Sequence, residues 1–282
     1  MTLDGTALGH WVELALPEPP WSRPVPFVGY VYLDASAGLS AKGGPADEPS
    51  APPSLTVRLP IGVPSRVMTD AEAAPRATPP AWIDSYGPQP QRDAPWRHDR
   101  AMAGRWHRSF PDDVQVLVHD GDPRRTGRLP EGCWIRVDEA RSIGARPATA
   151  ADGAVIARSA VAYVGALLHP PRQLTSVVEG ARVTFVPDPG GKHPLAVTDA
   201  YLDERARWTL GACPRCGLGE AFDPPSVLAA VVFGSLASRE GDPSGHDPTG
   251  EGLATGPPDR TVAFTAHCPM CGPPSAQSFA PA

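Results

Sequence analysis

The chain has very little lysine and no long apolar run. Only Lys42 and Lys192 are lysines, so arginine supplies the other 23 of its 25 basic residues. Together with the abundance of Ala, Pro and Gly, this indicates a high-GC genome and carries no functional signal. No apolar run approaches the roughly 20 residues that a bilayer span needs. Residues 1–16 also lack the basic start and continuous apolar stretch of a secretory signal. We therefore expect neither a membrane span nor a secretory signal.

Cysteine is scarce as well, with five residues in 282. Four of them form two short motifs and Cys133 stands alone, which does not fit a disulfide scaffold. This usage favours a reducing compartment, and we expect the protein in the cytoplasm. The net charge of -6 argues against a general nucleic-acid binder and favours solubility.

Proline and glycine are abundant. The 37 prolines and 28 glycines make 65 of 282 residues, a level typical of loop-rich or partly disordered segments. The hydrophobic content of 41% still permits a core. The length allows one large domain or two ordinary ones.

Two C-x-x-C-G motifs near the C-terminus carry the clearest chemistry. The first knuckle is residues 213–217 and the second is residues 268–272. Together they offer four thiolates, a complete tetrahedral shell for Zn²⁺. The sequence predicts a structural zinc site, closed to substrate, in a C-terminal zinc ribbon. Its predicted ligands are Cys213, Cys216, Cys268 and Cys271.

Other uses of these cysteines stay open. Two disulfides are one alternative, although a C-x-x-C bridge is usually a redox motif and the following glycines favour a metal. Redox or iron–sulfur chemistry is a second alternative. A third is a Cys₃His shell that uses His267, which precedes Cys268.

The N-terminal segment, residues 1–68, reads as a small β extension. Residues 10–16, 27–33 and 55–59 have the β-branched, aromatic or alternating pattern of strands. Residues 35–53, rich in Gly, Ala, Pro and Ser, read as a loop.

Residues 69–104 read as a proline-rich connection followed by a helix. The predicted helix covers 93–110, with Asp93 as its cap and Pro95 in its first turn. Trp96, Met102 and two further aromatics would share its buried face. Its basic residues could instead contact nucleic acid, because interleaved basic and aromatic side chains suit single strands. These candidates are Arg97, Arg100, Arg105 and Arg108.

Four strand-like segments follow, with Gly- and Pro-containing turns between them. They predict a small antiparallel barrel or a strongly curved sheet. Their ranges are 114–118, 133–137, 160–168 and 182–186.

The C-terminal part, residues 209–282, reads as the ribbon. A helix at 197–207, capped by Thr198 or Asp199, precedes it. A second helix is expected at 227–233, a mobile insertion at 236–259 and a strand at 261–265. Only about five residues separate the ribbon from the preceding domain, so we expect the two to pack together.

Residues 105–208 resemble the YegJ-like domain family, a bacterial domain of uncharacterised function. The resemblance lies in four segments, 113–118, 133–137, 163–171 and 174–185. This chain has His169 where the family commonly has Asn, and Ala181 where an acidic residue is usual. The resemblance implies a compact β-rich domain and transfers no catalytic residues.

We therefore expect an α+β, mainly β protein with parts at 1–68, 69–104, 105–208 and 209–282. The absence of a catalytic motif favours a non-enzymatic factor that binds a protein partner, such as an immunity or accessory protein of a bacterial conflict or secretion system. The alternative is a nucleic-acid-binding zinc-ribbon protein.

An enzyme with a concealed site is a further alternative. A pocket lined by His119, His169 and Arg136 would support it. Cys133 could be a nucleophile, but a cysteine on an apolar strand is usually buried and inert.

Overall fold

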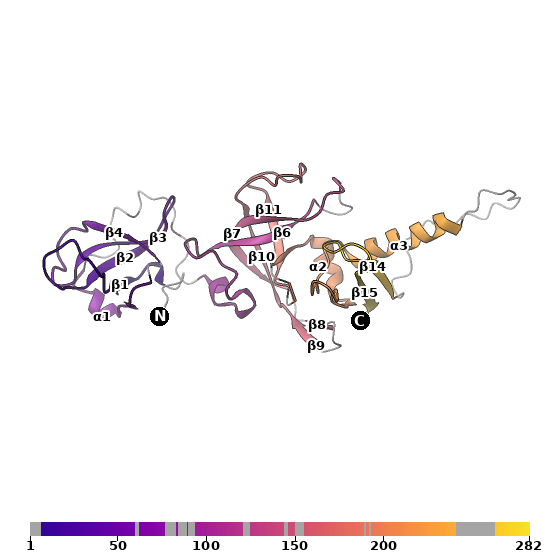
Figure 1. Cartoon of the computed structure of the whole chain (residues 1–282). Coiled ribbons are helices and arrows are strands. Elements are labelled where there is room, and N and C mark those ends of the chain that lie inside the picture. The colour runs from indigo at the N-terminus through magenta and orange to yellow at the C-terminus, as the bar shows by residue number, and fades with distance from the viewer. Residues whose placement is uncertain are drawn as a thin grey trace, which may run out of the picture. The chain divides into compact units, whose positions relative to one another are not determined.

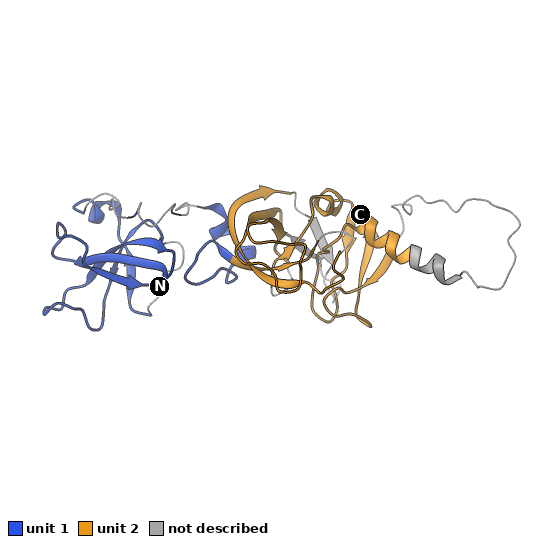
Figure 2. Cartoon of the chain, turned by 90° about the horizontal axis from the view of Figure 1, so that it is seen from above, with its two compact units in different colours: residues 1–113 blue, residues 114–282 orange. Residues whose placement is uncertain are grey.

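The computed structural model places the chain in two compact units, Met1–Asp113 and Val114–Ala282 (Figure 2). The predicted boundaries at 68, 104 and 208 divide the chain more finely and stay predictions. The described residues are 7–59, 62–76, 83, 89, 94–120, 125–143, 146–149, 155–188, 190–191, 193–240 and 263–282.

The first unit contains a five-stranded antiparallel sheet in the order β4-β3-β2-β1-β5 (Figure 1). Its strands are β1 (Trp11–Leu14), β2 (Phe27–Asp34), β3 (Gly38–Pro45), β4 (Leu55–Arg58) and β5 (Ser65–Val67). The three predicted strands are confirmed. The core beside the sheet is apolar, with Val12, Leu14, Phe27, Val31 and Leu39 all fully buried.

The prediction of a loop at 35–53 was wrong, because β3 lies inside it. Strand β3 pairs with β2 over eight residues, from Phe27↔Pro45 to Asp34↔Gly38. A Cβ at Gly43 would lie 1.9 Å from the carbonyl oxygen of Val28. The glycines that resemble a loop therefore permit two backbones to approach closely within the sheet.

The prediction of a helix at 93–110 was also wrong. Two short 3₁₀ helices, η3 (Pro95–His98) and η4 (Arg100–Met102), occupy this segment. Asp99 ends the first and caps the second, accepting a hydrogen bond from Ala101 N–H at 2.8 Å. The predicted cap, Asp93, lies outside the described residues. A short helix, α1 (Asp70–Ala73), also interrupts the expected connection.

The second unit contains a closed five-stranded barrel in the order β10-β11-β12-β6-β7. Its strands are β6 (Asp113–Val118), β7 (Glu131–Ser142), β10 (Val161–Leu167), β11 (Arg182–Val186) and β12 (Leu195–Ala196). The predicted barrel is confirmed, although its fifth strand, β12, has only two residues and was not foreseen. The register of its parallel pairing with β6 consists of Leu195↔Leu117. A hairpin of β8 (Arg146–Thr149) and β9 (Val155–Arg158) was also missed.

The remainder of the second unit is a three-stranded sheet with two helices. The sheet order is β13-β15-β14, from β13 (Trp208–Leu210), β14 (Phe264–His267) and β15 (Ala276–Pro281). Helix α2 (Asp199–Arg205) begins at the predicted cap, where Thr198 Oγ1 accepts a hydrogen bond from Tyr201 N–H at 3.1 Å.

Helix α3 (Pro225–Glu240) is longer than the segment predicted at 227–233. It includes the first residues of the expected mobile insertion at 236–259, and the rest of that insertion lies outside the described residues. No helix in the described ranges is long and apolar enough to cross a membrane.

The three-stranded sheet packs directly on the barrel, as expected from the short connection. One buried cluster joins Ala162 and Val186 of the barrel to Trp208, Leu210 and Phe279 of the sheet. Side chains of α2 and α3 extend the same core. The barrel therefore provides a packed base for the segment that carries the cysteines.

Candidate metal centre

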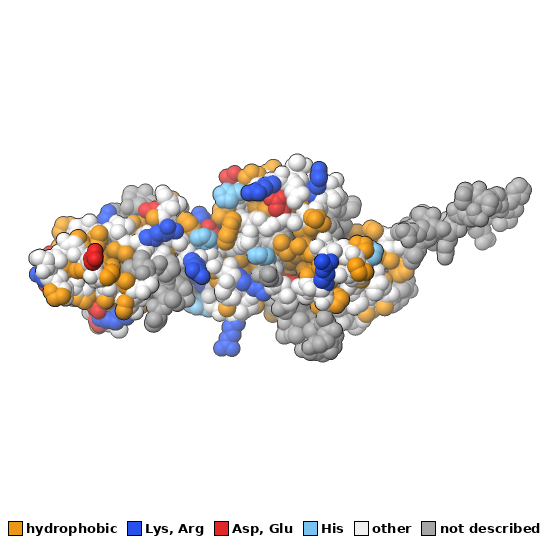
Figure 3. Space-filling model, in the orientation of Figure 1, with side chains coloured by type: hydrophobic (Ala, Val, Ile, Leu, Met, Phe, Trp, Pro, Cys, Tyr) orange, Lys and Arg blue, Asp and Glu red, His pale blue; other side chains and the backbone are white. Residues whose placement is uncertain are grey.

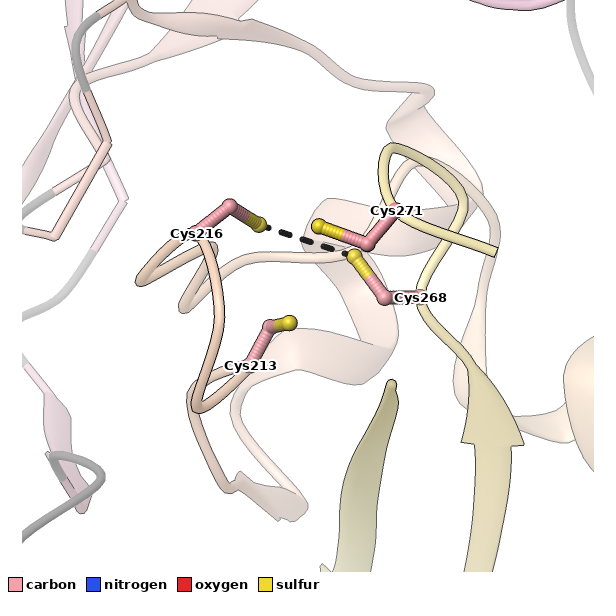
Figure 4. Close-up of side chains that lie close together, drawn as sticks. All are labelled: Cys213, Cys216, Cys268 and Cys271. Atoms are coloured by element: carbon pink, nitrogen blue, oxygen red, sulfur yellow. Dashed lines mark hydrogen bonds between the residues drawn. The ribbon is translucent and has the colours of Figure 1, made fainter. Parts of the chain in front are cut away.

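The four predicted ligands converge on one point from two loops. Cys213 and Cys216 lie on the loop that follows β13, and Cys268 and Cys271 lie on the loop between β14 and β15 (Figure 4). Pairing of β13 and β14 with β15 brings the loops together, although 51 residues separate Cys216 from Cys268.

The spacing of the sulfurs suits a metal ion. All four Sγ atoms lie within 4.8 Å of one another, and the Cys216 and Cys268 sulfurs are 3.6 Å apart. Tetrahedral zinc–sulfur bonds of about 2.3 Å would separate the sulfurs by about 3.8 Å. The four cysteines therefore lie close enough to bind one metal ion.

Both knuckles have the same backbone turn. Gly217 N–H donates to the Cys213 carbonyl at 2.8 Å, and Gly272 N–H donates to the Cys268 carbonyl at 2.9 Å. The two glycines have φ values of +77° and +64°, a conformation that glycine adopts without strain. The glycine that follows each cysteine pair therefore closes the turn that aims the sulfurs inward.

Backbone amides also affect the charge of the sulfurs. Burial by itself would raise the pKa of Cys213, but the amides of Cys216 and Arg215 lower it to about 7. Burial raises the pKa of Cys268, although the amides of Met270 and Cys271 oppose this effect. Close-packed thiols cannot all ionise without a cation between them, so this site is suited to a metal that neutralises the charge.

The first knuckle rests against the loop that precedes β12. A Cβ at Gly190 would lie 2.1 Å from the Gly217 carbonyl oxygen, so the two loops touch backbone to backbone. Gly219 N–H donates to the buried Asp188 carboxylate at 3.0 Å. Barrel residues thus fix the position of the first two cysteines.

A buried ion pair, which we did not predict from the sequence, supports the same knuckle. Arg205 at the end of α2 donates to both carboxylate oxygens of Glu220, at 3.1 and 2.7 Å. The two side chains are 2% and 0% exposed, and the hydroxyl of Tyr201 also donates to Glu220. The sequence signal for this pair is the position of Glu220, a charged residue between the apolar Leu218 and Phe222.

The alternatives for the cysteines find less support. All five cysteines are free thiols, and the 3.6 Å separation exceeds the 2.05 Å of a disulfide. His267 is exposed on β14 and is not part of the cluster of four. Cys133 lies apart on β7 at 6% exposure, and burial raises its pKa to about 11.

The four arginines proposed for nucleic acid lie in different environments. Arg97 forms a buried pair with Asp112, whose carboxylate accepts from Arg97 at 2.8 and 2.7 Å and from Trp96 Nε1 at 2.9 Å. Arg100 and Arg108 are exposed and Arg105 is half-buried. On the face in Figure 3, described basic side chains are scattered among acidic and apolar ones. The nucleic-acid interpretation stays a prediction, and Arg97 has a structural role.

The described cavity does not bring together the polar set proposed for a concealed enzyme. His119 lines a cavity at one end of the barrel, but His169 and Arg136 are absent from the described lining of that cavity.

The comparisons with known proteins do not assign the chain to a family. No protein-family model, no curated protein and no solved structure matches it. The resemblance to the YegJ-like family therefore stays a prediction, and what is known of the chemistry rests on the cysteine cluster.

Proposed function

We propose that this protein is a non-enzymatic interaction factor whose C-terminal ribbon is held by a structural zinc ion. The closed set of four sulfurs carries the proposal, because a shell of four thiolates leaves no position for substrate. Zinc fits better than a hard cation such as Mg²⁺, since soft thiolates select zinc, copper(I) or iron. Zinc is redox-inert and tetrahedral, which suits a centre that stabilises structure.

Metal analysis of the purified protein tests the zinc. We expect about one zinc per chain, a colourless protein, and the absorption of tetrahedral thiolate ligation after replacement by Co²⁺. Cys213→Ser should lower the zinc content below one and destabilise the fold, whereas Cys133→Ala should retain all the metal. Full zinc retention in Cys213→Ser would contradict four-cysteine ligation, and bound iron would contradict zinc.

The tip of the second knuckle supports an interaction role. Met270 lies between the two cysteines of this knuckle and is 36% exposed, one of few large hydrophobic side chains so exposed in the described chain. Pro214 and Arg215, between the cysteines of the first knuckle, are also exposed. Methionine adapts to varied apolar surfaces, and a metal-bound turn would present it rigidly. We propose a protein partner at this tip, in keeping with an immunity or accessory role in a bacterial conflict or secretion system.

A photo-crosslinking amino acid placed at position 270 tests the partner in cells. We expect one dominant crosslinked protein, which disappears in the Cys213→Ser background. The same probe at Leu129, which is 63% exposed on the barrel unit, is the control. Equal crosslinking from both positions, or none from position 270, would count against an interface at this tip.

A further inference from the structure

The barrel has a cavity of about 280 Å³ that is separate from the cysteines. The carboxyl ends of β6 and β12, the start of β11 and the first residue before α2 line it, together with the loop that leads into β11. Barrel mouths are common positions for ligand sites, and this volume suits a small molecule. The position and the volume of this cavity therefore resemble those of ligand-binding pockets in other proteins.

A buried carboxylate lines this cavity. Asp120 is 2% exposed, and its Oδ2 atom accepts a hydrogen bond from Thr126 N–H at 2.5 Å. Within the described part of the chain, its Oδ1 atom is buried and has no hydrogen-bond partner. An unsatisfied buried acceptor is costly, so a donor that reaches Oδ1 gains free energy. Because Oδ1 is closed to solvent, the carboxylate must turn toward the cavity to accept that donor.

Asp120 carries a negative charge at neutral pH. Burial would raise its pKa, but hydrogen bonds from the Thr126 hydroxyl and amide, with the field of His119, lower the pKa below its usual value. A carboxylate that is ionised and lacks one donor favours a cation with N–H groups.

The two arginines that line the cavity donate to other acceptors. Arg125 donates to the main-chain oxygen of Asp120, at 3.3 and 3.2 Å. Arg182 directs its guanidinium to Asp138 on β7, at 2.8 Å through Nη2. Both arginines therefore have acceptors other than the Asp120 carboxylate.

The walls of the cavity are largely apolar. Valine side chains from three strands or strand ends and from the preceding loop contribute most of them. They are Val118, Val177, Val178, Val183 and Val197. Val118, Val183 and Val197 are almost fully buried, whereas Val178 is 63% exposed, so the side of the wall formed by the strands is preformed. Such walls accept a short branched hydrocarbon.

We propose that the cavity binds a small organic cation, an amine with a short branched apolar body whose ammonium group donates to Asp120. This site goes beyond the interaction role of the ribbon and does not use the metal. A ligand of this kind satisfies the buried acceptor and fills the valine-lined space with one molecule.

Three small probes with the same branched body test the charge preference by NMR titration of the full chain. The probes are isobutylammonium, isobutanol and isovalerate, which share a branched body and differ in charge. We expect saturable shifts of the amide signals around Asp120 and Val197 with isobutylammonium. Isobutanol, which is neutral, and isovalerate, which is an anion, should both bind more weakly, and equal binding of isobutanol would also overturn the proposal. Tighter binding of isovalerate, or the absence of saturable binding for all three probes, would overturn the proposal.

Asp120→Asn is the central variant, because asparagine keeps an acceptor for Thr126 and removes the charge. Its affinity for isobutylammonium should fall about tenfold to hundredfold, the usual range for a charge-assisted hydrogen bond. Its unfolding temperature should stay the same or rise, since an unsatisfied buried charge is removed. Asp203→Asn, at an exposed aspartate of α2, is the matched control and should bind as the parent does. Unchanged affinity in Asp120→Asn would overturn the proposal.

A second variant tests the cavity without changing the carboxylate. Ala181→Phe places a large ring in the lining. It should abolish binding of isobutylammonium while the rest of the spectrum shows a folded barrel. Retained binding in a folded Ala181→Phe protein would also overturn the proposal.

Discussion

Single residues of the two knuckles differ in how much space surrounds them. Gly217 and Gly272 share a positive φ, but a Cβ at Gly217 would lie 2.6 Å from the Gly190 carbonyl oxygen, while a Cβ at Gly272 meets nothing within 4 Å. The first turn is packed against barrel residues and the second is open. A side chain at Gly272 would therefore add backbone strain alone, whereas a side chain at Gly217 would add both backbone strain and a steric clash.

We predict that Gly272→Ala costs about 1–2 kcal/mol, the usual penalty for a side chain in the left-handed region. Gly217→Ala should cost clearly more, because the clash adds to the same strain. Urea unfolding of both variants with saturating zinc measures the difference. Equal losses would show that the contact with Gly190 contributes nothing.

Cys133 is predicted to be unreactive in the native protein. Its pKa of about 11 results from burial and from the charge of Glu131, so only about one thiol in a thousand is ionised at pH 8. A thiol reagent should label it only after unfolding, measured by mass spectrometry with Cys133→Ala as the control. Rapid labelling of the native protein would restore the nucleophile hypothesis.

The raised pKa of Cys133 also makes the stability of the fold depend on pH. The unfolded chain ionises Cys133 above about pH 8.5, before the folded chain does. The contribution of Cys133 to stability is therefore complete below that pH and is lost as pH rises toward 11.

Among the secondary-structure elements, α2 connects the barrel to the first knuckle through Arg205. Its guanidinium also donates to the Ser159 carbonyl at 3.0 Å, just before β10. One buried side chain thus joins three segments that are far apart in sequence. Removal of either charge would leave the other buried without its partner.

We predict that Arg205→Met costs about 3–5 kcal/mol and that the Arg205→Met, Glu220→Gln double variant costs less than the sum of the two single changes. Denaturant unfolding of the four proteins of the cycle measures the coupling. Arg141→Met is the control, because Arg141 pairs with Glu139 at the surface and should cost under about 1 kcal/mol. Strict additivity would contradict a coupled pair.

How far the sequence predicts these elements depends on what stabilises each one. The cap at Thr198 and the strands at 27–33 and 182–186 follow from local patterns and were predicted. Strand β3 was missed because its glycines serve contact with β2, a tertiary reason that composition does not reveal. The four cysteines were predictable from their spacing, whereas the pairing of Arg205 with Glu220 depends on the packing of α2.

In the whole molecule, each unit has its own core. The cluster beside the N-terminal sheet is built from residues between 7 and 59, with partly buried neighbours up to Val67. Cys213, Cys268 and Cys271 belong instead to a cluster with Leu195, Leu218 and Phe222 in the second unit. Loss of a metal should therefore act on one core only.

We predict that a strong chelator increases hydrogen exchange in β13, β14 and β15 and leaves β1 to β4 protected. Exchange mass spectrometry with and without added zinc measures this, and restored protection after zinc addition is the control. Uniform loss of protection across both units would contradict separate cores.

The seam of the barrel connects the two candidate sites. Leu195 of β12 packs with Cys213 and Cys268, and its neighbour Ala196 lines the cavity that contains Asp120. The printed register of β12 with β6 is a single pair, Leu195 with Leu117, so few backbone contacts hold this seam closed. A metal bound by the cysteines and an amine bound at Asp120 would both favour the closed seam. Their binding is then linked thermodynamically: each should raise the affinity of the other by the same factor, although they share no ligand atom.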